Sequence, residues 1–223
     1  MTLVTLAAVL QPALHHGYAV PGLVCLGWED MRAYTLAAQA EQAPIILQAG
    51  PGCRAHTPIP VLAAMFRHLA ASVDIPIVAH LDHAHSLDEC KAALDAGFTS
   101  VMFDGSRLPL DENIARTAEV AALAHAAGAS CEGEIGFVGY AQGAASEGTD
   151  PIEAARFALE TRIDAVAISV GNVHLQQTPG TGLDLARLDA IQKLTTTPLV
   201  IHGGSGVPVS YTHLRAHETG RNL

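Results

Sequence analysis

Three histidines of this 223-residue chain each come at or just beyond the end of an apolar, strand-like run. They are His83 after residues 75–81, His174 after residues 165–170 and His202 after residues 198–201. Three imidazoles with one open coordination position are the ligand set of a catalytic zinc site. The residue types therefore predict a metal centre, if the fold brings these strand ends to one place.

Carboxylates accompany the histidines. Asp82 stands directly before His83, where it could serve as the proton-transfer partner of a metal ligand. Neighbouring side chains of a regular strand point to opposite faces, so we expect the turn at the strand end to bring Asp82 over the metal. Glu134 ends the fifth strand-like run, and Asp104 follows the fourth. Asp104 is either an acid near the metal or a turn residue, and both interpretations stay open.

A single histidine at a strand end is more often a surface or capping residue than a ligand, so the prediction depends on three of them sharing one edge. We assign structural or surface roles to His80, His85 and His125. The only two lysines, Lys91 and Lys193, fall on predicted helices. Neither lies at a strand end where it could form a Schiff base, so carbon–carbon chemistry here would need the metal.

Glycines follow His202 in the run Gly203-Gly204-Ser205-Gly206. The backbone N–H groups of such a turn can converge into an anion nest, and the Ser205 hydroxyl adds a further donor. Barrel enzymes often bind phosphate after the seventh and eighth strands. The run therefore predicts a phosphate site beside the metal, with a plain glycine-rich turn as the alternative.

Strand-like runs alternate with longer, alanine-rich amphipathic segments. The predicted strands cover residues 18–25, 44–48, 75–81, 99–103, 130–135, 165–170 and 198–201. The predicted helices cover residues 29–42, 60–72, 86–96, 110–127, 151–161 and 183–194. Nearly all-apolar strands in this alternation predict a parallel sheet buried on both faces. The predicted fold class is α/β, a (β/α)8 TIM barrel that is truncated after strand seven.

The same pattern predicts how the chain is divided. Residues 1–209 form one incomplete barrel domain, and residues 210–223, which lack both strand alternation and a core face, form a non-native or out-of-frame tail. Residues 136–149 are polar, rich in glycine and serine, and longer than most connections, which is typical of a mobile lid. At residues 51–53 we predict only a turn.

Composition excludes several classes of protein. The formal net charge of −10 argues against a nucleic-acid partner and against an anionic membrane surface. No apolar run is long enough to span a bilayer, and no basic residue precedes Arg32 as a signal peptide would require. The four cysteines form no CxxC pair, and we interpret them as reduced thiols of a cytoplasmic protein.

Five motifs resemble those of the class II, zinc-dependent ketose-bisphosphate aldolases, a family that includes fructose- and tagatose-bisphosphate aldolases. They are His80-Leu81-Asp82-His83, the segment 97–106, Glu132-Gly133-Glu134-Ile135-Gly136, Gly171-Asn172-Val173-His174 and His202-Gly203-Gly204-Ser205-Gly206. The match runs from about residue 2 to residue 209 in the family's order and spacing. The resemblance implies a (β/α)8 barrel, usually a homodimer or tetramer, that reversibly cleaves a ketose bisphosphate to dihydroxyacetone phosphate and an aldehyde.

The resemblance also implies roles for individual residues. Carried over by position, His83, His174 and His202 would bind zinc, and Asp82 would exchange the proton at the aldehyde oxygen. Gly203, Gly204 and Ser205 would bind the phosphate. Glu134 and Asp104 would lie near the metal, as alternative ligands or as partners of the ligands. The implied cofactor is Zn²⁺, with a monovalent cation as a second candidate. The implied partner is a phosphorylated sugar.

Several positions depart from the family pattern, and two of them bear on the activity. Leu175 stands where the family usually has glycine, and Gln142 aligns with the lid glutamate, for which Glu147 is a candidate substitute. The leading hypothesis is a zinc-dependent aldolase. The alternative, favoured by Gln142 and Leu175, is a divergent member that binds zinc and a sugar phosphate with altered specificity or little activity. A purely structural or interaction barrel is a third hypothesis, and the clustered histidines argue against it.

Overall fold

The structure, a computed structural model, describes residues 2–175, 182–204 and 207. Ser205 and the predicted tail over residues 210–223 lie outside the described residues. Within the described part, strands and helices alternate along the chain as predicted. The fold class is α/β.

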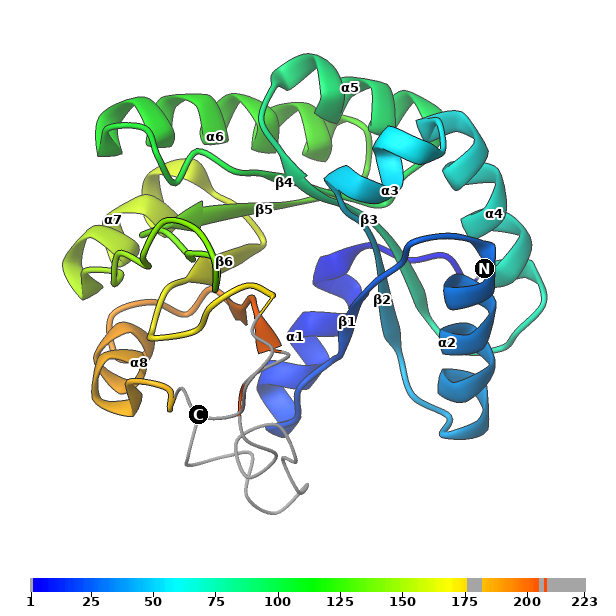
Figure 1. Cartoon of the computed structure of the whole chain (residues 1–223), viewed down its shortest axis with the longest axis horizontal. Coiled ribbons are helices and arrows are strands. Elements are labelled where there is room, and N and C mark those ends of the chain that lie inside the picture. The colour runs from blue at the N-terminus through cyan, green and yellow to red at the C-terminus, as the bar shows by residue number, and fades with distance from the viewer. Residues whose placement is uncertain (1, 176–181, 205–206, 208–223) are drawn as a thin grey trace.

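Seven parallel strands form one sheet in which each strand pairs with the next along the chain. They are β1 (Gly22–Val24), β2 (Ile45–Ala49), β3 (Ile77–Ala84), β4 (Ser100–Phe103), β5 (Ser130–Ile135), β6 (Ala165–Ile168) and β7 (Leu199–Ile201). Parallel strands that pair in sequential order are the arrangement of a TIM barrel, and Figure 1 shows the sheet curled into an open arc. Strands β2 to β6 are buried along their whole lengths, which explains the mainly apolar sequences of β2, β4 and β6.

Seven of the eight helices in the described part of the chain lie mainly on the outside of this arc, whereas α1 does not (Figure 1). The helices are α1 (Leu6–His16), α2 (Trp28–Ala40), α3 (Pro51–His56), α4 (Ile59–Ala71), α5 (Leu87–Ala96), α6 (Leu110–Ala126), α7 (Pro151–Thr161) and α8 (Leu185–Gln192). Ser86 caps α5 and Asp150 caps α7, and each side chain accepts hydrogen bonding from backbone N–H groups of the first turn. No helix in residues 2–175, 182–204 and 207 is long and apolar enough to cross a membrane.

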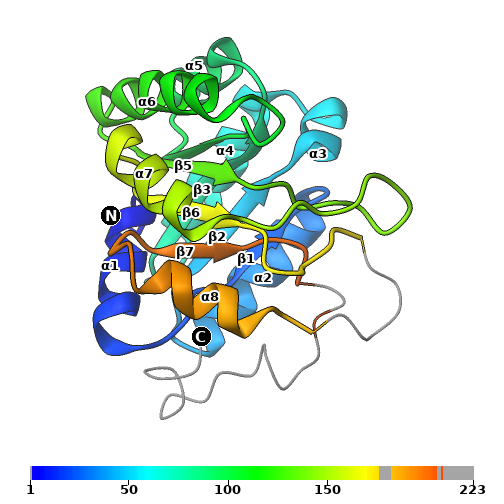
Figure 2. The same ribbon diagram turned by 90° about the vertical axis from the view of Figure 1, so that its left-hand side faces the viewer.

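Helix α1 lies at the amino ends of the strands, opposite the long loops (Figure 2). Its Leu6 and Val9 pack against Ile46 of β2, Val78 of β3 and Ala165 of β6. These partners come from widely separated strands, so α1 fills the concave side of the curled sheet at one end. The predicted elements begin only at residue 18, and α1 is an addition to them.

Two predictions about elements are corrected. The predicted strand over residues 18–25 is too long, since only Gly22–Val24 pair with β2 and Pro21, which precedes them, has no N–H for the ladder. The turn predicted at residues 51–53 is wrong, because Pro51 begins α3. Proline is well placed at a first helical position, where its missing N–H would have no helical partner.

Candidate metal centre

Three imidazole side chains meet at the carboxyl ends of β3, β6 and β7. His83 lies within β3, His174 in the loop after β6, and His202 directly after β7. One ring nitrogen of each lies within 4.8 Å of the others. His83 Nε2 and His202 Nδ1 are 3.1 Å apart. Tetrahedral zinc with bonds of about 2.0–2.1 Å holds its nitrogen ligands about 3.4 Å apart, so the spacing suits such an ion.

A bulge in β3 brings the side chain of Asp82 to the same side of the strand as the side chain of His83. The register of β3 against β4 shifts between Leu81 and Ala84, and His83 has a φ of 50°, which is uncommon for a residue other than glycine. Asp82 Oδ1 consequently lies 4.0 Å from His83 Nε2, although consecutive residues of a regular strand face opposite ways. The expectation that a turn brings Asp82 to the histidines therefore agrees with the geometry, and the turn lies inside the strand.

Carboxylates orient two of the three rings. His83 Nδ1 donates a hydrogen bond to Asp104 Oδ2 at 2.8 Å, and His202 Nε2 donates one to Glu132 Oε1 at 2.9 Å. Asp104 is itself held by the hydroxyl of Ser106 at 2.6 Å. These bonds leave His83 Nε2 and His202 Nδ1 as the free ligand atoms, the arrangement that carboxylates impose on metal-binding histidines.

The carboxylates also set the electrostatic potential of the site. Burial works against a charged His202, but its hydrogen bond to Glu132 and the charges of nearby carboxylates outweigh burial and raise its pKa to about 9. Burial and the charge of Asp104 raise the pKa of Glu134 to about 7. A potential that favours protonated imidazole and disfavours another carboxylate charge is one that also attracts a divalent cation.

His174 differs from the other two histidines. Burial and the charges of His83 and His202 lower its pKa to about 4, which keeps its ring neutral, the form that binds metals. Its Nε2 is buried and has no hydrogen-bond partner among the described residues, and the same holds for Asp82 Oδ1 and Glu134 Oε2. Buried polar atoms without partners are costly. The residues present therefore fit a cation bound between these side chains.

Glu134 and Asp104 both lie next to His83. Glu134 Oε2 is 3.7 Å from His83 Nδ1, and His83, Asp104 and Glu134 form a second group whose ligand atoms lie within 4.8 Å of one another. Because His83 Nδ1 is already bound to Asp104, the group of three histidines offers the better ligand set. Asp104 and Glu134 are better placed as partners of the ligands.

The predicted lid folds back onto the loop that carries His174. The N–H of His174 donates to Gly139 O at 2.8 Å, and the N–H of Ala141 donates to His174 O at 3.0 Å. Between them the Tyr140 ring stacks on the His174 ring, with centroids 5.0 Å apart. Ser146 donates a hydrogen bond to Asn172 O and ties the second arm of this hairpin to the same loop.

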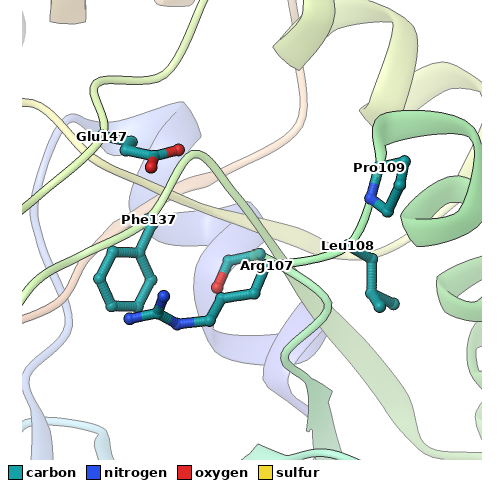
Figure 3. A pocket seen from close by; sticks show the side chains of 6 residues that line it. Arg107, Leu108, Pro109, Phe137 and Glu147 are labelled. Atoms are coloured by element: carbon teal, nitrogen blue, oxygen red, sulfur yellow. The ribbon is translucent and has the colours of Figure 1, made fainter. Parts of the chain in front are cut away.

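The two lid residues named from the sequence are not among the described contacts of the histidines. Gln142 is exposed at the tip of the lid. Glu147 lines a cavity of about 250 Å³ with Ser106, Arg107, Leu108, Pro109 and Phe137 (Figure 3). There the Arg107 guanidinium lies 3.9 Å from the centre of the Phe137 ring. Glu147 therefore belongs to the neighbouring cavity.

The predicted phosphate turn begins beside the histidines. Gly203 has a φ of 67°, and a Cβ at this position would lie 2.5 Å from Val173 O, so only glycine fits between β7 and the His174 loop. At Gly204 a Cβ would meet no atom within 4 Å. The turn that carries these backbone N–H groups therefore begins next to the loop that carries His174.

Several residues of the site have no role in the sequence-based prediction. Glu132 precedes Glu134 by two positions on β5 and so faces the same way, a signal that could have found it. His80, predicted to be structural, is fully buried, bonds Ser100 Oγ through Nδ1 at 2.8 Å, and lies 3.7 Å from Glu132 through Nε2. Tyr140 carries no comparable signal in the sequence.

A curled parallel sheet whose carboxyl edge carries a histidine cluster able to hold a metal ion defines a protein of the TIM-barrel enzyme class. Comparison with known proteins narrows the class. The chain belongs to the fructose-bisphosphate aldolase class-II family, whose profile matches residues 4–219. Members of this family are carbon–carbon lyases that act on phosphorylated sugars, generally with zinc.

Individual relatives carry two different names. The fructose-bisphosphate aldolase of Streptococcus pyogenes serotype M1 is 39% identical over 217 residues, covering 93% of this chain and 73% of that protein. The 6-phospho-5-dehydro-2-deoxy-D-gluconate aldolase of Bacillus subtilis strain 168 is 37% identical over 216 residues, covering 93% and 74%. Both names describe aldolases, so the relatives agree on the reaction type and differ in the substrate.

Solved structures agree with the fold. The YdjI aldolase from Escherichia coli K12 superposes with a TM-score of 0.86 at 26% identity, covering 99% of this chain and 79% of that one. A putative fructose-1,6-biphosphate aldolase from Coccidioides immitis superposes with a TM-score of 0.83 at 27% identity, covering 98% and 78%. The seven described strands therefore correspond to part of an aldolase TIM barrel.

Proposed function

We propose that this protein is a zinc-dependent aldolase that reversibly cleaves a ketose bisphosphate, of the fructose- or tagatose-1,6-bisphosphate type, to dihydroxyacetone phosphate and an aldehyde. The observation that carries the proposal is the meeting of three ring nitrogens within 4.8 Å, beside the buried carboxylate of Asp82. Metal ligands and a proton acceptor in one buried site are what a metal-assisted aldol cleavage requires.

In this proposal His83, His174 and His202 hold the ion, with Asp104 and Glu132 fixing two of the rings. Bound zinc would act as a Lewis acid that polarises the ketone and stabilises the enediolate. Glu134 lies beside His83 and would be a partner of the ligands or an alternative ligand. The backbone N–H groups of Gly203 and Gly204 and the hydroxyl of Ser205 would bind the phosphate.

Asp82 would move the proton. Burial works against its charged form, but the positive charge of His83 and the neighbouring histidines outweighs burial and lowers its pKa. An ionised Asp82 can accept the proton of the substrate hydroxyl as that oxygen becomes the aldehyde, and can return it in the reverse reaction. Its Oδ1 is buried without a partner among the described residues, so it is free to do so.

A second candidate is a divergent family member that binds zinc and a sugar phosphate with altered specificity or little activity. Gln142 favours it, because a carboxamide in place of the lid glutamate is a poor base. The Bacillus subtilis relative, named for a phosphorylated deoxygluconate derivative, shows that relatives at this level of identity carry different substrate names. Leu175 favours it as well, because a large side chain, 74% exposed and at a φ of 56°, stands where the family usually has glycine.

The remaining proposals concern the oligomeric state, the cellular location, a second cofactor and the division of the chain. We propose a homo-oligomer, dimer or tetramer, in the cytoplasm, where the four buried free thiols would stay reduced. A monovalent cation is a candidate second cofactor. A barrel domain over residues 1–209 and a non-native tail over residues 210–223 also stay predictions.

The test measures zinc content and retro-aldol cleavage together. The protein should contain about one zinc per chain, and a chelator should abolish cleavage on a panel of fructose-1,6-bisphosphate, tagatose-1,6-bisphosphate and 6-phospho-5-dehydro-2-deoxygluconate. His83→Ala should lose zinc, whereas Asp82→Asn should keep zinc and lose cleavage. His125→Ala, on the outer helix α6, is the matched control and should keep both. Zinc without cleavage of any sugar on the panel would favour the divergent member.

A further inference from the structure

We infer that Arg54 is a positioning residue that holds the bulge of β3 and thereby sets the direction of both Asp82 and His83. The inference rests on the proposed function, since it assigns Arg54 a role through those two residues. Arg54 lies on α3, the short helix that follows β2.

The Arg54 side chain is buried, with only 7% of its surface exposed. Its Nη1 donates to the backbone carbonyls of Ala49 and Asp82, and its Nη2 donates to the carbonyl of His83 at 3.1 Å. Its Nε donates to Glu89 Oε1 at 2.8 Å, an ion pair that compensates the buried charge. One guanidinium thus joins the carboxyl ends of β2 and β3 to the first turn of α5.

Two of these bonds go to the residues that depart from regular strand geometry. His83 has a φ of 50°, and the register against β4 shifts between Leu81 and Ala84. A non-glycine residue in this region is unfavourable unless its surroundings hold it there. The bulge interrupts the regular register at these two residues, and Arg54 donates hydrogen bonds to the backbone carbonyls of both.

The direction of these carbonyls is linked to the direction of the side chains. In a regular strand Asp82 and His83 would face opposite sides of the sheet, and only one could reach the histidine cluster. The bulge brings Asp82 Oδ1 to 4.0 Å from His83 Nε2. Arg54 touches neither side chain, so it would act on the site only through the backbone.

Lysine offers a conservative test, because it keeps the charge but lacks the planar fork that reaches several acceptors at once. Arg54→Lys should fold, with a cooperative melt of the metal-free protein. Its zinc affinity, measured by competition with a chromophoric chelator, should fall at least about tenfold, as for other losses of partners behind metal ligands. Its Co²⁺-substituted form should show a changed visible spectrum, and kcat for cleavage should fall more than KM rises.

Arg67→Lys is the matched control. Arg67 lies on α4, is exposed, and donates through Nη1 to a single carbonyl, that of Ala96, at 2.6 Å. The zinc affinity and the Co²⁺ spectrum of the Arg67→Lys protein should equal those of the wild type. An Arg54→Lys protein with wild-type zinc affinity and spectrum would overturn the inference.

If Arg54→Lys shows no cooperative melt, Glu89→Gln takes its place. This variant removes the charge that holds Arg54 Nε and leaves the backbone of β3 untouched, so a weakened zinc affinity is expected and an unchanged one overturns the inference. A wild-type protein that binds zinc but cleaves no ketose phosphate contradicts the proposed function alone, and the zinc comparison still decides the role of Arg54.

Discussion

Glu132 accepts a hydrogen bond from His202 Nε2 at 2.9 Å, and both side chains are buried. The other carboxylate oxygen of Glu132 lies 3.7 Å from His80 Nε2, so a buried line of polar groups runs from Ser100 through His80 and Glu132 to His202. The carboxylate therefore fixes which nitrogen of His202 faces the other two histidines.

Glu132→Gln should weaken zinc binding. The amide can still accept a hydrogen bond, but it no longer supplies the negative charge that makes His202 a stronger ligand, and such changes typically lower metal affinity about 10–100-fold. A chelator competition titration measures the effect. Glu119→Gln, on the exposed side of α6, should leave affinity unchanged. Equal zinc affinity in the two variants would contradict a role for Glu132.

Tyr140→Ala should loosen the lid. Removing the ring that stacks on His174 leaves the hairpin attached to that loop by the backbone hydrogen bonds and the Ser146 hydroxyl alone among the described contacts. We expect faster amide exchange and faster proteolysis within residues 139–146, measured by mass spectrometry. Tyr140→Phe keeps the stacked ring and should protect this segment nearly as well as the wild type. Identical exchange in the Ala and Phe variants would show that the ring does not hold the lid.

Gly203→Ala should disturb the metal centre, and Gly204→Ala should not. The first substitution places a methyl group 2.5 Å from Val173 O and forces alanine to a φ of 67°, so β7 or the His174 loop must move. The second meets no atom within 4 Å. Zinc content after dialysis against metal-free buffer should therefore drop only for Gly203→Ala. Wild-type zinc content in both variants would contradict this close approach.

Buried thiols should make stability fall at alkaline pH. Burial, with nearby negative groups, raises the pKa of Cys25 and of Cys90 from 9.0 to about 12. Because the unfolded thiols ionise first, the stabilisation is complete below pH 9 and is lost between about pH 9 and 12, by at most about 1.4 kcal/mol per pH unit for each thiol.

The measurement is the free energy of urea unfolding between pH 8 and pH 10. The wild type should lose stability more steeply over this interval than the variant Cys25→Ala/Cys90→Ala, whatever the variant's absolute stability. The comparison of slopes removes contributions from other titrating groups, which both proteins share. Parallel slopes would mean that neither thiol is kept protonated by the fold.

Much of the fold follows from the sequence because strands of a parallel sheet that are buried on both faces are mainly apolar, as β2, β4 and β6 are. The meeting of His83, His174 and His202 followed in turn, since the carboxyl ends of parallel strands share one edge. Boundaries were less accurate where burial is partial, as at β1.

The rest depended on contacts that leave no local pattern. His83 has a positive φ and its carbonyl accepts a hydrogen bond from Arg54, and nothing in the residue type predicts this conformation. The sequence predicts a turn in place of helix α3 because proline and glycine, as at Pro51 and Gly52, are typical turn residues. The stacking of Tyr140 on His174 depends on how the lid folds back, which the sequence does not predict.

The position of α1 has a consequence for the order in which the molecule assembles. Neighbouring strands of the sheet are consecutive in sequence, so the sheet can grow outward as the chain is made. Helix α1 precedes the seven described strands in the chain, yet its Leu6 and Val9 pack on Ala165 of β6, and the N–H of its Ala7 donates to Ser130 Oγ of β5. Its full burial must wait for most of the sheet, so α1 docks only after strands that follow it in the sequence have formed.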